Sequence, residues 1–233
     1  IDAAATNYAA NQWEHYAAQE YAGGSGTKDD PYLIETPEQL MRLAVNVENK
    51  AHVEAYFGGK YSKGRYFKQT KDIVLSENTF AGIKWIRHTL AEQPGLTNVP
   101  GFKEENLDVD PETYTLKSGS RTFSGIGKKN NDDDYQKFSG VYDGDGHAII
   151  GMVKNTASGI AAIFNETDGA VIKNLIVKDS YVAGNSNASL LVGRAIGTTV
   201  LNCYTSGIIF DGGSYSAGLI ANADNCRILN SAS

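Results

Sequence analysis

Three short segments decide the fold that the sequence predicts: VIKN (residues 171–174), TVLN (199–202) and RILN (227–230). Each segment ends in an asparagine, and these asparagines stand 28 residues apart twice over. Self-similarity at a fixed period of roughly 20–50 residues is typical of repeat architectures, in which equivalent segments stack on one another. The C-terminal third of the chain is therefore predicted to be a solenoid.

The same register extends to other positions, because apolar residues map onto apolar residues and turn residues onto turn residues. The matched sets are Ile163, Leu191 and Leu219; Phe164, Val192 and Ile220; Ile172, Val200 and Ile228; Val182 and Phe210; Gly184 and Gly212; Ser186 and Ser214. Segments 171–177, 180–183 and 190–193 are rich in strand-forming residues and are separated by Gly, Asn and Ser, which mark strand ends. Each repeat is therefore expected to consist of short strands.

The length of the repeat suits one turn of a β-helix. At roughly 3.3 Å per residue, 28 extended residues span about 90 Å, which is enough for three short sides and their corners. Successive turns would stack about 4.8 Å apart, so equivalent residues would lie above one another. The predicted fold class is mainly β, a parallel, right-handed β-helix with an N-terminal helical cap. Asn174, Asn202 and Asn230 are expected to form a structural amide ladder at one corner.

Stacking also brings charged residues together. Glu166 maps onto Arg194, and such a pair would face across one rung. Asp168 and Asp224 lie two rungs apart in the same column, at roughly 10 Å by the spacing above. That separation is near the upper end for the two carboxylates of an inverting glycosidase. Aspartate is also a common turn residue, and the structural interpretation is preferred.

Composition narrows the class of protein. The chain has 233 residues with 41% hydrophobic and 21% charged residues, which is normal for a folded chain. Its net charge of −6 disfavours nucleic acid as a partner.

Cys203 maps onto Ser231 and Cys226 onto Thr198, so the two cysteines do not stack, and both are expected to be buried free thiols.

Neither a transmembrane segment nor a signal-peptide pattern is visible in the sequence. An exported protein would therefore have lost its signal before the first residue shown. Ser233 falls in the middle of a repeat, so further repeats or domains of the same polypeptide are expected.

The chain is expected to divide into residues 1–65, an N-terminal helical or capping segment; 66–137, the first strands with a long insertion; and 138–233, the repeats. Residues 2–22 are rich in alanine and are expected to form a helix. Thr36-Pro37-Glu38-Gln39 is a helix start with a capping box. The apolar stripe that follows would cover the end of the solenoid; it consists of Leu40, Met41, Leu43, Ala44 and Val47.

The first repeat is expected near residues 149–152. These residues match residues 172–175 at a spacing of 23, which predicts one shorter turn of the solenoid.

Several segments resemble a known group of bacterial surface proteins. They are residues 24–34 and 36–40, the strand-like residues 67–75, the F-x-G-x-x-D-G-x-G-H segment at 138–147, and the repeats with Asn202-Cys203-Tyr204 and Gly218-Leu219-Ile220. The repeats are similar to the GLUG motif, although 151, 192–193 and 219–221 depart from it. Residues 1–22 and 84–122 lie outside the likeness.

The resemblance implies an exported, adhesin-like β-helix of the kind also found as a non-catalytic region in IgA-specific metallopeptidases. The His-Glu-x-x-His zinc motif of those peptidases follows none of the four histidines, so peptidase activity is disfavoured.

Other candidate sites are weak. An EF-hand starting at Asp143 would need Gly at its sixth position and an acid at its twelfth, and the chain has Ala148 and Lys154 there. A tight turn in which Gly144 and Gly146 take positive φ is preferred. The run Asp132, Asp133 and Asp134 is a weak calcium candidate, and no metal or other cofactor is expected.

Long loops on a rigid scaffold commonly carry binding residues. Residues 84–122 form such an insertion, and its aromatic residues could stack on sugars or fill a protein pocket. These weak candidates are Trp85, Phe102 and Tyr114, with Phe123 beside them.

The sequence therefore predicts an exported cell-surface module for adhesion, ligand binding or display, without catalysis. Its expected partner is a host or cell-wall glycan or protein. The alternative is a carbohydrate-active β-helix enzyme of the polysaccharide lyase or hydrolase type. Its candidate acids are Asp168 and Asp224, or the acids of residues 104–112.

Overall fold

A computed structural model describes residues 8–48, 60–76, 121–127, 136–156, 159–184, 186–211 and 214–233. Within these ranges the regular elements are short strands, one α-helix, α1 (Pro37–Glu48), and a 3-10 helix, η2 (Trp13–Tyr16). The strands are β1 (Tyr32–Ile34), β2 (Tyr66–Gln69), β3 (Ile73–Val74), β4 (Val141–Asp143), β5 (Ala148–Ile150), β6 (Val153–Asn155), β7 (Phe164–Asp168), β8 (Val171–Lys173), β9 (Ile176–Gly184), β10 (Asn187–Ser189), β11 (Val192–Ile196), β12 (Thr199–Leu201), β13 (Tyr204–Asp211), β14 (Tyr215–Ala217), β15 (Ile220–Asp224) and β16 (Arg227–Leu229).

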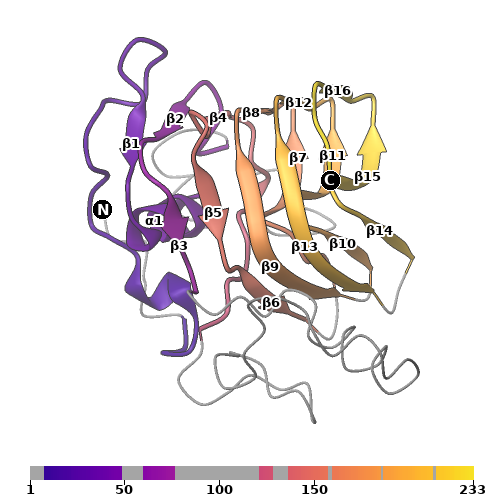
Figure 1. Ribbon diagram of the computed structural model, residues 1–233. Coiled ribbons are helices and arrows are strands. Elements are labelled where there is room, and N and C mark those ends of the chain that lie inside the picture. The colour runs from indigo at the N-terminus through magenta and orange to yellow at the C-terminus, as the bar shows by residue number, and fades with distance from the viewer. Residues whose placement is uncertain are drawn as a thin grey trace.

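The strands form stacked sheets in which every described pair of strands is parallel. The largest sheet has the order β1-β2-β4-β8-β12-β16, a second has β3-β5-β9-β13 with β6 also paired to β9, and smaller sheets are β7-β11-β15 and β10-β14. Neighbours in a sheet are far apart in the sequence, because each strand pairs with its equivalent in the next repeat (Figure 1). The prediction of a mainly β fold is confirmed.

The predicted 28-residue register is confirmed in three of the sheets, including β10-β14. Val200 pairs with Ile172 on one side and Ile228 on the other, and Val192 pairs in the same way with Phe164 and Ile220. Apolar side chains of successive repeats therefore stack on one another inside the molecule.

The register fails by one residue in the middle of β9 and β13. Tyr204 pairs with Ile176 as expected, but Val182 pairs with Ile209 and Gly184 with Asp211. The predicted matches of Val182 with Phe210 and of Gly184 with Gly212 are therefore wrong.

A β-bulge explains this shift. Between the paired positions 177 and 180, β9 has two residues where β13 has one, and Asp179 takes a left-handed conformation with φ 51°. Gly207 lies opposite, where an added Cβ would stand 2.4 Å from the Ser180 carbonyl oxygen. The next turn restores the register, since Asn187 pairs with Tyr215 and the Ser214 N–H donates to the Ser186 carbonyl.

The prediction of a short turn at a spacing of 23 is also wrong. Ile149 pairs with Val177, at a spacing of 28, and Tyr142 pairs with Ile172. The turn between β4 and β5 is two residues longer than its equivalent between β8 and β9, so this repeat is longer rather than shorter.

That longer turn is the predicted tight turn, with one difference. Positive φ occurs at Asp145 (51°) and Gly146 (83°), but not at Gly144. Glycine is needed at 144 for another reason, because an added Cβ would lie 2.5 Å from the Asn174 carbonyl oxygen.

Helix α1 begins as its sequence predicts. The Gln39 N–H donates to Thr36 Oγ1 at 3.3 Å, and Gln39 Oε1 accepts the Glu35 N–H at 2.8 Å, so the reciprocal bond falls one residue before the cap. The predicted apolar stripe is buried in the main hydrophobic core. Figure 1 shows α1 at the same end of the stack as β1, opposite β16.

Residues 8–22 do not form the predicted α-helix. The described part contains only η2, and residues 1–7 lie outside the described ranges. The Trp13 N–H donates to the Thr122 carbonyl, and the Thr122 N–H donates to the Asn11 carbonyl, each at 2.8 Å. These strand-like bonds use backbone groups that a helix would need internally, and tertiary pairing thus overrides local helix propensity.

The core rests on one inward column of the largest sheet. Phe67, Tyr142, Ile172 and Val200 are buried in successive strands, whereas Ile228 in the last strand is about half exposed. Full burial of each large apolar side chain contributes about 1.5–3 kcal/mol. Burial of this column is therefore a main contribution to the stability of the stack.

The column gives a test of the fold. Ile172→Ala should lower the free energy of unfolding by about 2–5 kcal/mol, because it opens a cavity between two rungs. Val171→Ala is the matched control on the partly exposed side of the same strand and should cost about 1 kcal/mol or less. Urea denaturation followed by circular dichroism measures both, and equal losses would contradict the inward placement of Ile172.

Candidate binding surface

The asparagine corner lies where β8, β12 and β16 end. Asn174, Asn202 and Asn230 all adopt the left-handed conformation, with φ of 52°, 52° and 48°. This conformation costs most residues roughly 1–2 kcal/mol, and asparagine is among the few that tolerate it. The requirement for an abrupt turn at the same place in each repeat thus explains why asparagine recurs there.

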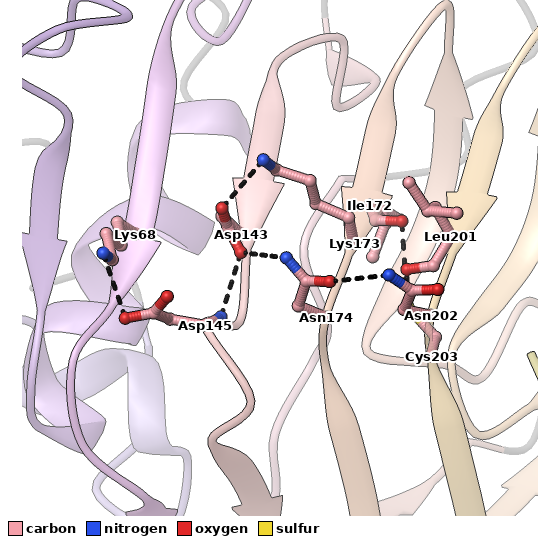
Figure 2. A network of polar contacts seen from close by, with 9 residues as sticks. All are labelled: Lys68, Asp143, Asp145, Ile172, Lys173, Asn174, Leu201, Asn202 and Cys203. Carbon is pink, nitrogen blue, oxygen red and sulfur yellow. Dashed lines mark hydrogen bonds and ion pairs between the residues drawn. The ribbon is translucent and has the colours of Figure 1, made fainter. Parts of the chain in front are cut away.

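The corner side chains also bind one another. Asn202 Nδ2 donates to Asn174 Oδ1 at 3.1 Å, and Asn174 Nδ2 donates to Asp143 Oδ1 at 2.9 Å (Figure 2). The predicted ladder is confirmed between Asn174 and Asn202 but not at Asn230, whose described side chain makes no hydrogen bond to Asn202, and it starts from the Asp143 carboxylate, which the register did not indicate.

Asp143 is the centre of this polar network. Its carboxylate also accepts the Asp145 N–H at 3.0 Å and pairs with Lys173 Nζ at 2.9 Å, while Lys68 Nζ pairs with Asp145 at 3.0 Å (Figure 2). Partial burial opposes the charged form, but the hydrogen bonds from Lys173, Asn174 and the Asp145 backbone outweigh it and lower the pKa of Asp143. These polar groups bind one another, which indicates a structural role.

A second corner rule concerns the residue after a left-handed position. Its hydroxyl or thiol donates to the carbonyl two residues earlier, at 2.9–3.4 Å, in Ser180, Thr198, Cys203, Cys226 and Ser231. Both cysteines therefore occupy a serine-like position. Both are free thiols as predicted; Cys203 is buried, but Cys226 is partly exposed, so its predicted burial is wrong.

The corner can be tested by two substitutions at Asn202. Asn202→Gly keeps the left-handed backbone and loses mainly the amide bond, about 0.5–1.5 kcal/mol. Asn202→Ala should be less stable than Asn202→Gly, because alanine adds a left-handed penalty of roughly 1–2 kcal/mol. Denaturant midpoints of the two variants decide the order, and a glycine variant less stable than the alanine variant would contradict this account.

The two thiols should differ in reactivity. Burial raises the pKa of Cys203 to about 11, so little thiolate forms at neutral pH. Iodoacetamide at about pH 8 should therefore label Cys226 first and Cys203 only after denaturation, as read by peptide mass spectrometry. Equal labelling in the folded protein would contradict the buried position of Cys203.

The sheet β7-β11-β15 carries the other predicted charges. Asp168 and Asp224 lie in one column with Ile196 between them, as the register predicts. Asp168 forms an ion pair with Lys60, a partner that the sequence did not indicate.

The predicted Glu166–Arg194 pair is present on the same sheet. Arg194 Nη1 lies 3.6 Å from Glu166 Oε1. The glutamate side chain is buried while the arginine side chain is exposed, so the pair spans the edge of the core.

The remaining candidates have different outcomes. Trp85, Phe102, Tyr114, the Asp132–Asp134 run and residues 104–112 lie outside the described residues. Phe123 is described and lies buried in the core. Across the described ranges, no three His, Cys, Asp or Glu side chains gather as a metal site. In the same ranges, no helix is long and apolar enough to cross a membrane.

The last repeat presents an exposed apolar edge that the sequence analysis did not single out. Its large side chains lie about half exposed: Tyr204, Tyr215, Ile228 and Leu229. The register could have indicated this, because each occupies a stacking position in the final strands. Among the described residues, this exposed edge is therefore the binding candidate, whereas the network around Asp143 is structural.

Comparison with known proteins gives one distant relative. The chain is 31% identical over 119 residues to halomucin of Haloquadratum walsbyi, a large surface protein. The match covers 48% of this chain and 1% of halomucin, so the chain spans only a very small part of that protein. No family model matches, and no solved structure matches. The resemblance to GLUG-motif proteins therefore stays a prediction.

Proposed function

We propose that this chain is an exported cell-surface module, a right-handed parallel β-helix that displays or binds a glycan or protein without catalysis. The observation that carries the proposal is the in-register pairing of parallel strands from successive repeats, with α1 at the first end of the stack. Such a scaffold is elongated, rigid and extended by adding repeats. These properties suit a spacer or a display element within a longer surface protein.

The similarity to halomucin supports a surface or structural role. The charges on the described corner also favour this role, since Asp143, Lys173 and Lys68 are held in rung-to-rung bonds. A display scaffold needs such internal pairing to stay rigid. In its specific form, the proposal is that the chain mediates adhesion and that its partner is a host or cell-wall glycan or protein.

Binding can be tested with the whole chain on arrays of glycans and of host surface proteins. We expect a ligand whose binding falls at least tenfold in a variant with Trp85→Ala, Phe102→Ala and Tyr114→Ala, because aromatic rings supply much of the energy of sugar and protein contacts. The matched control carries Tyr204→Ala and Tyr215→Ala on the last repeat.

Loss of binding in the control alone would move the site from the insertion to the exposed edge of the stack. No binding to any ligand on either array would contradict the adhesive form of the proposal and leave a spacer.

An enzyme is the second candidate, because Asp168 and Asp224 share one column of a single sheet. The ion pair of Asp168 with Lys60 favours a structural role, since it holds the carboxylate in place. We therefore expect no product from a panel of acidic polysaccharides. Product release that Asp168→Ala and Asp224→Ala both abolish would replace the display proposal with catalysis.

A further inference from the structure

A buried polar cluster lies apart from the corner network, between the N-terminal segment and the strands β6 and β7. Glu14, Lys154 and Asn165 are 0%, 5% and 6% exposed. Charged residues are almost never buried so completely without a specific partner. The cluster therefore needs an explanation that the stacking of repeats does not provide.

The three side chains meet at the backbone of one residue, Ser124. Its N–H donates to Glu14 Oε1 at 2.6 Å, and its carbonyl accepts from both Lys154 Nζ and Asn165 Nδ2. A second bond from Asn165 Nδ2 reaches the Gly127 carbonyl at 2.6 Å. Both amide hydrogens are thus committed to carbonyls, which fixes the orientation of the Asn165 amide.

This orientation turns the carboxamide oxygen toward the lysine. Lys154 Nζ lies 2.5 Å from Asn165 Oδ1, so the amine stands beside the amide carbonyl group. Among the described residues, Glu14 Oε2 has no hydrogen-bond donor. The site thus joins a buried amine, an oriented carboxamide and a carboxyl group with one free oxygen.

Burial favours the neutral forms of both charged residues. Burial raises the pKa of Glu14 to about 7 and lowers the pKa of Lys154 to about 8. Glu48 also acts on the cluster: its charge raises both pKa values, and its Oε2 accepts the Tyr8 hydroxyl at 2.8 Å. A neutral amine is a nucleophile, and a neutral carboxyl group can donate a proton.

We propose that Lys154 and Asn165 form an intramolecular isopeptide bond, with Glu14 as the group that transfers the proton. The geometry of the three buried side chains around Ser124 carries this proposal, independently of the proposed display function. The proposed bond is a covalent cross-link between β6 and β7. It would form between two side chains that the structure shows joined by a buried hydrogen bond.

The reaction balances without any further reactant. The Lys154 Nζ lone pair attacks the Asn165 Cγ, a new Cγ–Nζ bond forms, and the Cγ–Nδ2 bond breaks. The amine nitrogen loses one proton and the departing nitrogen gains one, so it leaves as ammonia. Glu14 can donate a proton to the departing group and accept one from the amine, which returns it to its starting state. No electrons are gained or lost.

The bond would close the segment between residues 154 and 165, which are 11 positions apart. The cross-linked Lys154 nitrogen keeps one hydrogen that can still be donated to the Ser124 carbonyl, whereas the bond from Asn165 Nδ2 to that carbonyl is lost with the ammonia. A covalent link of this kind restricts the unfolded chain in the way that a disulfide does, and it needs no oxidising environment.

The test is the intact mass of the purified wild-type chain. We expect a mass lower than that of the sequence by one ammonia molecule. Chymotrypsin cuts after Phe164, and the peptides containing Lys154 and Asn165 should stay joined after this cut, as tandem mass spectrometry would show. An unmodified mass, a loss of water, or ammonia loss at another residue would each overturn the proposal.

Variants assign the roles. Lys154→Arg, Asn165→Ala and Glu14→Gln should each keep the full sequence mass, whereas Lys178→Arg, on β9 outside the cluster, should still lose ammonia. Circular dichroism identifies folded variants. A folded Glu14→Gln protein that loses ammonia as completely as the wild type would overturn the role given to Glu14, and cross-linking in Lys154→Arg would overturn the assignment of the amine.

Discussion

Each repeat must turn its backbone at the same place as the repeat below it, and this constraint shapes the rest of the structure. The left-handed residues at 174, 202 and 230 satisfy it. When the corners coincide, the strands between them pair in parallel and their apolar side chains stack in columns. When one repeat contains an extra residue, as at Asp179, the shift stays local because the next corner restores the register. Corner conformation thus determines which side chains are buried.

Much of this arrangement could be predicted from the sequence. The 28-residue period identified the strands, the apolar columns and the asparagine ladder, because stacking forces equivalent positions into contact. The start of α1 was equally predictable, since a capping residue and its partner are local features. Alanine-rich residues 8–22 were mispredicted for the opposite reason, because pairing with the distant Thr122 replaced the helix. A single sequence shows local features such as a helix cap. It does not show which backbone segments pair when they lie a hundred residues apart.

The candidate sites show the same division. Asp143 lies 31 positions from Asn174, because the turn after Asp143 has two extra residues and Asp143 itself pairs with Lys173, one position before Asn174. A fixed period could not connect the two. Glu14, Ser124 and Lys154 come from segments without any common period, so only the folded chain brings them together. By contrast, Asp168 and Asp224 were placed correctly in one column, but the ion pair with Lys60 was not predictable from spacing.

The amide ladder has a direction along the stack. Asn202 donates to Asn174 in the rung before it, and Asn174 in turn donates to the carboxylate of Asp143, where the ladder ends. Bonds that point the same way polarise one another, so a change in one affects its neighbours. Spontaneous deamidation of Asn174 would replace the donor that faces Asp143 with a second negative charge. The corner that organises the fold is thus also where chemical ageing of an asparagine would weaken it most directly.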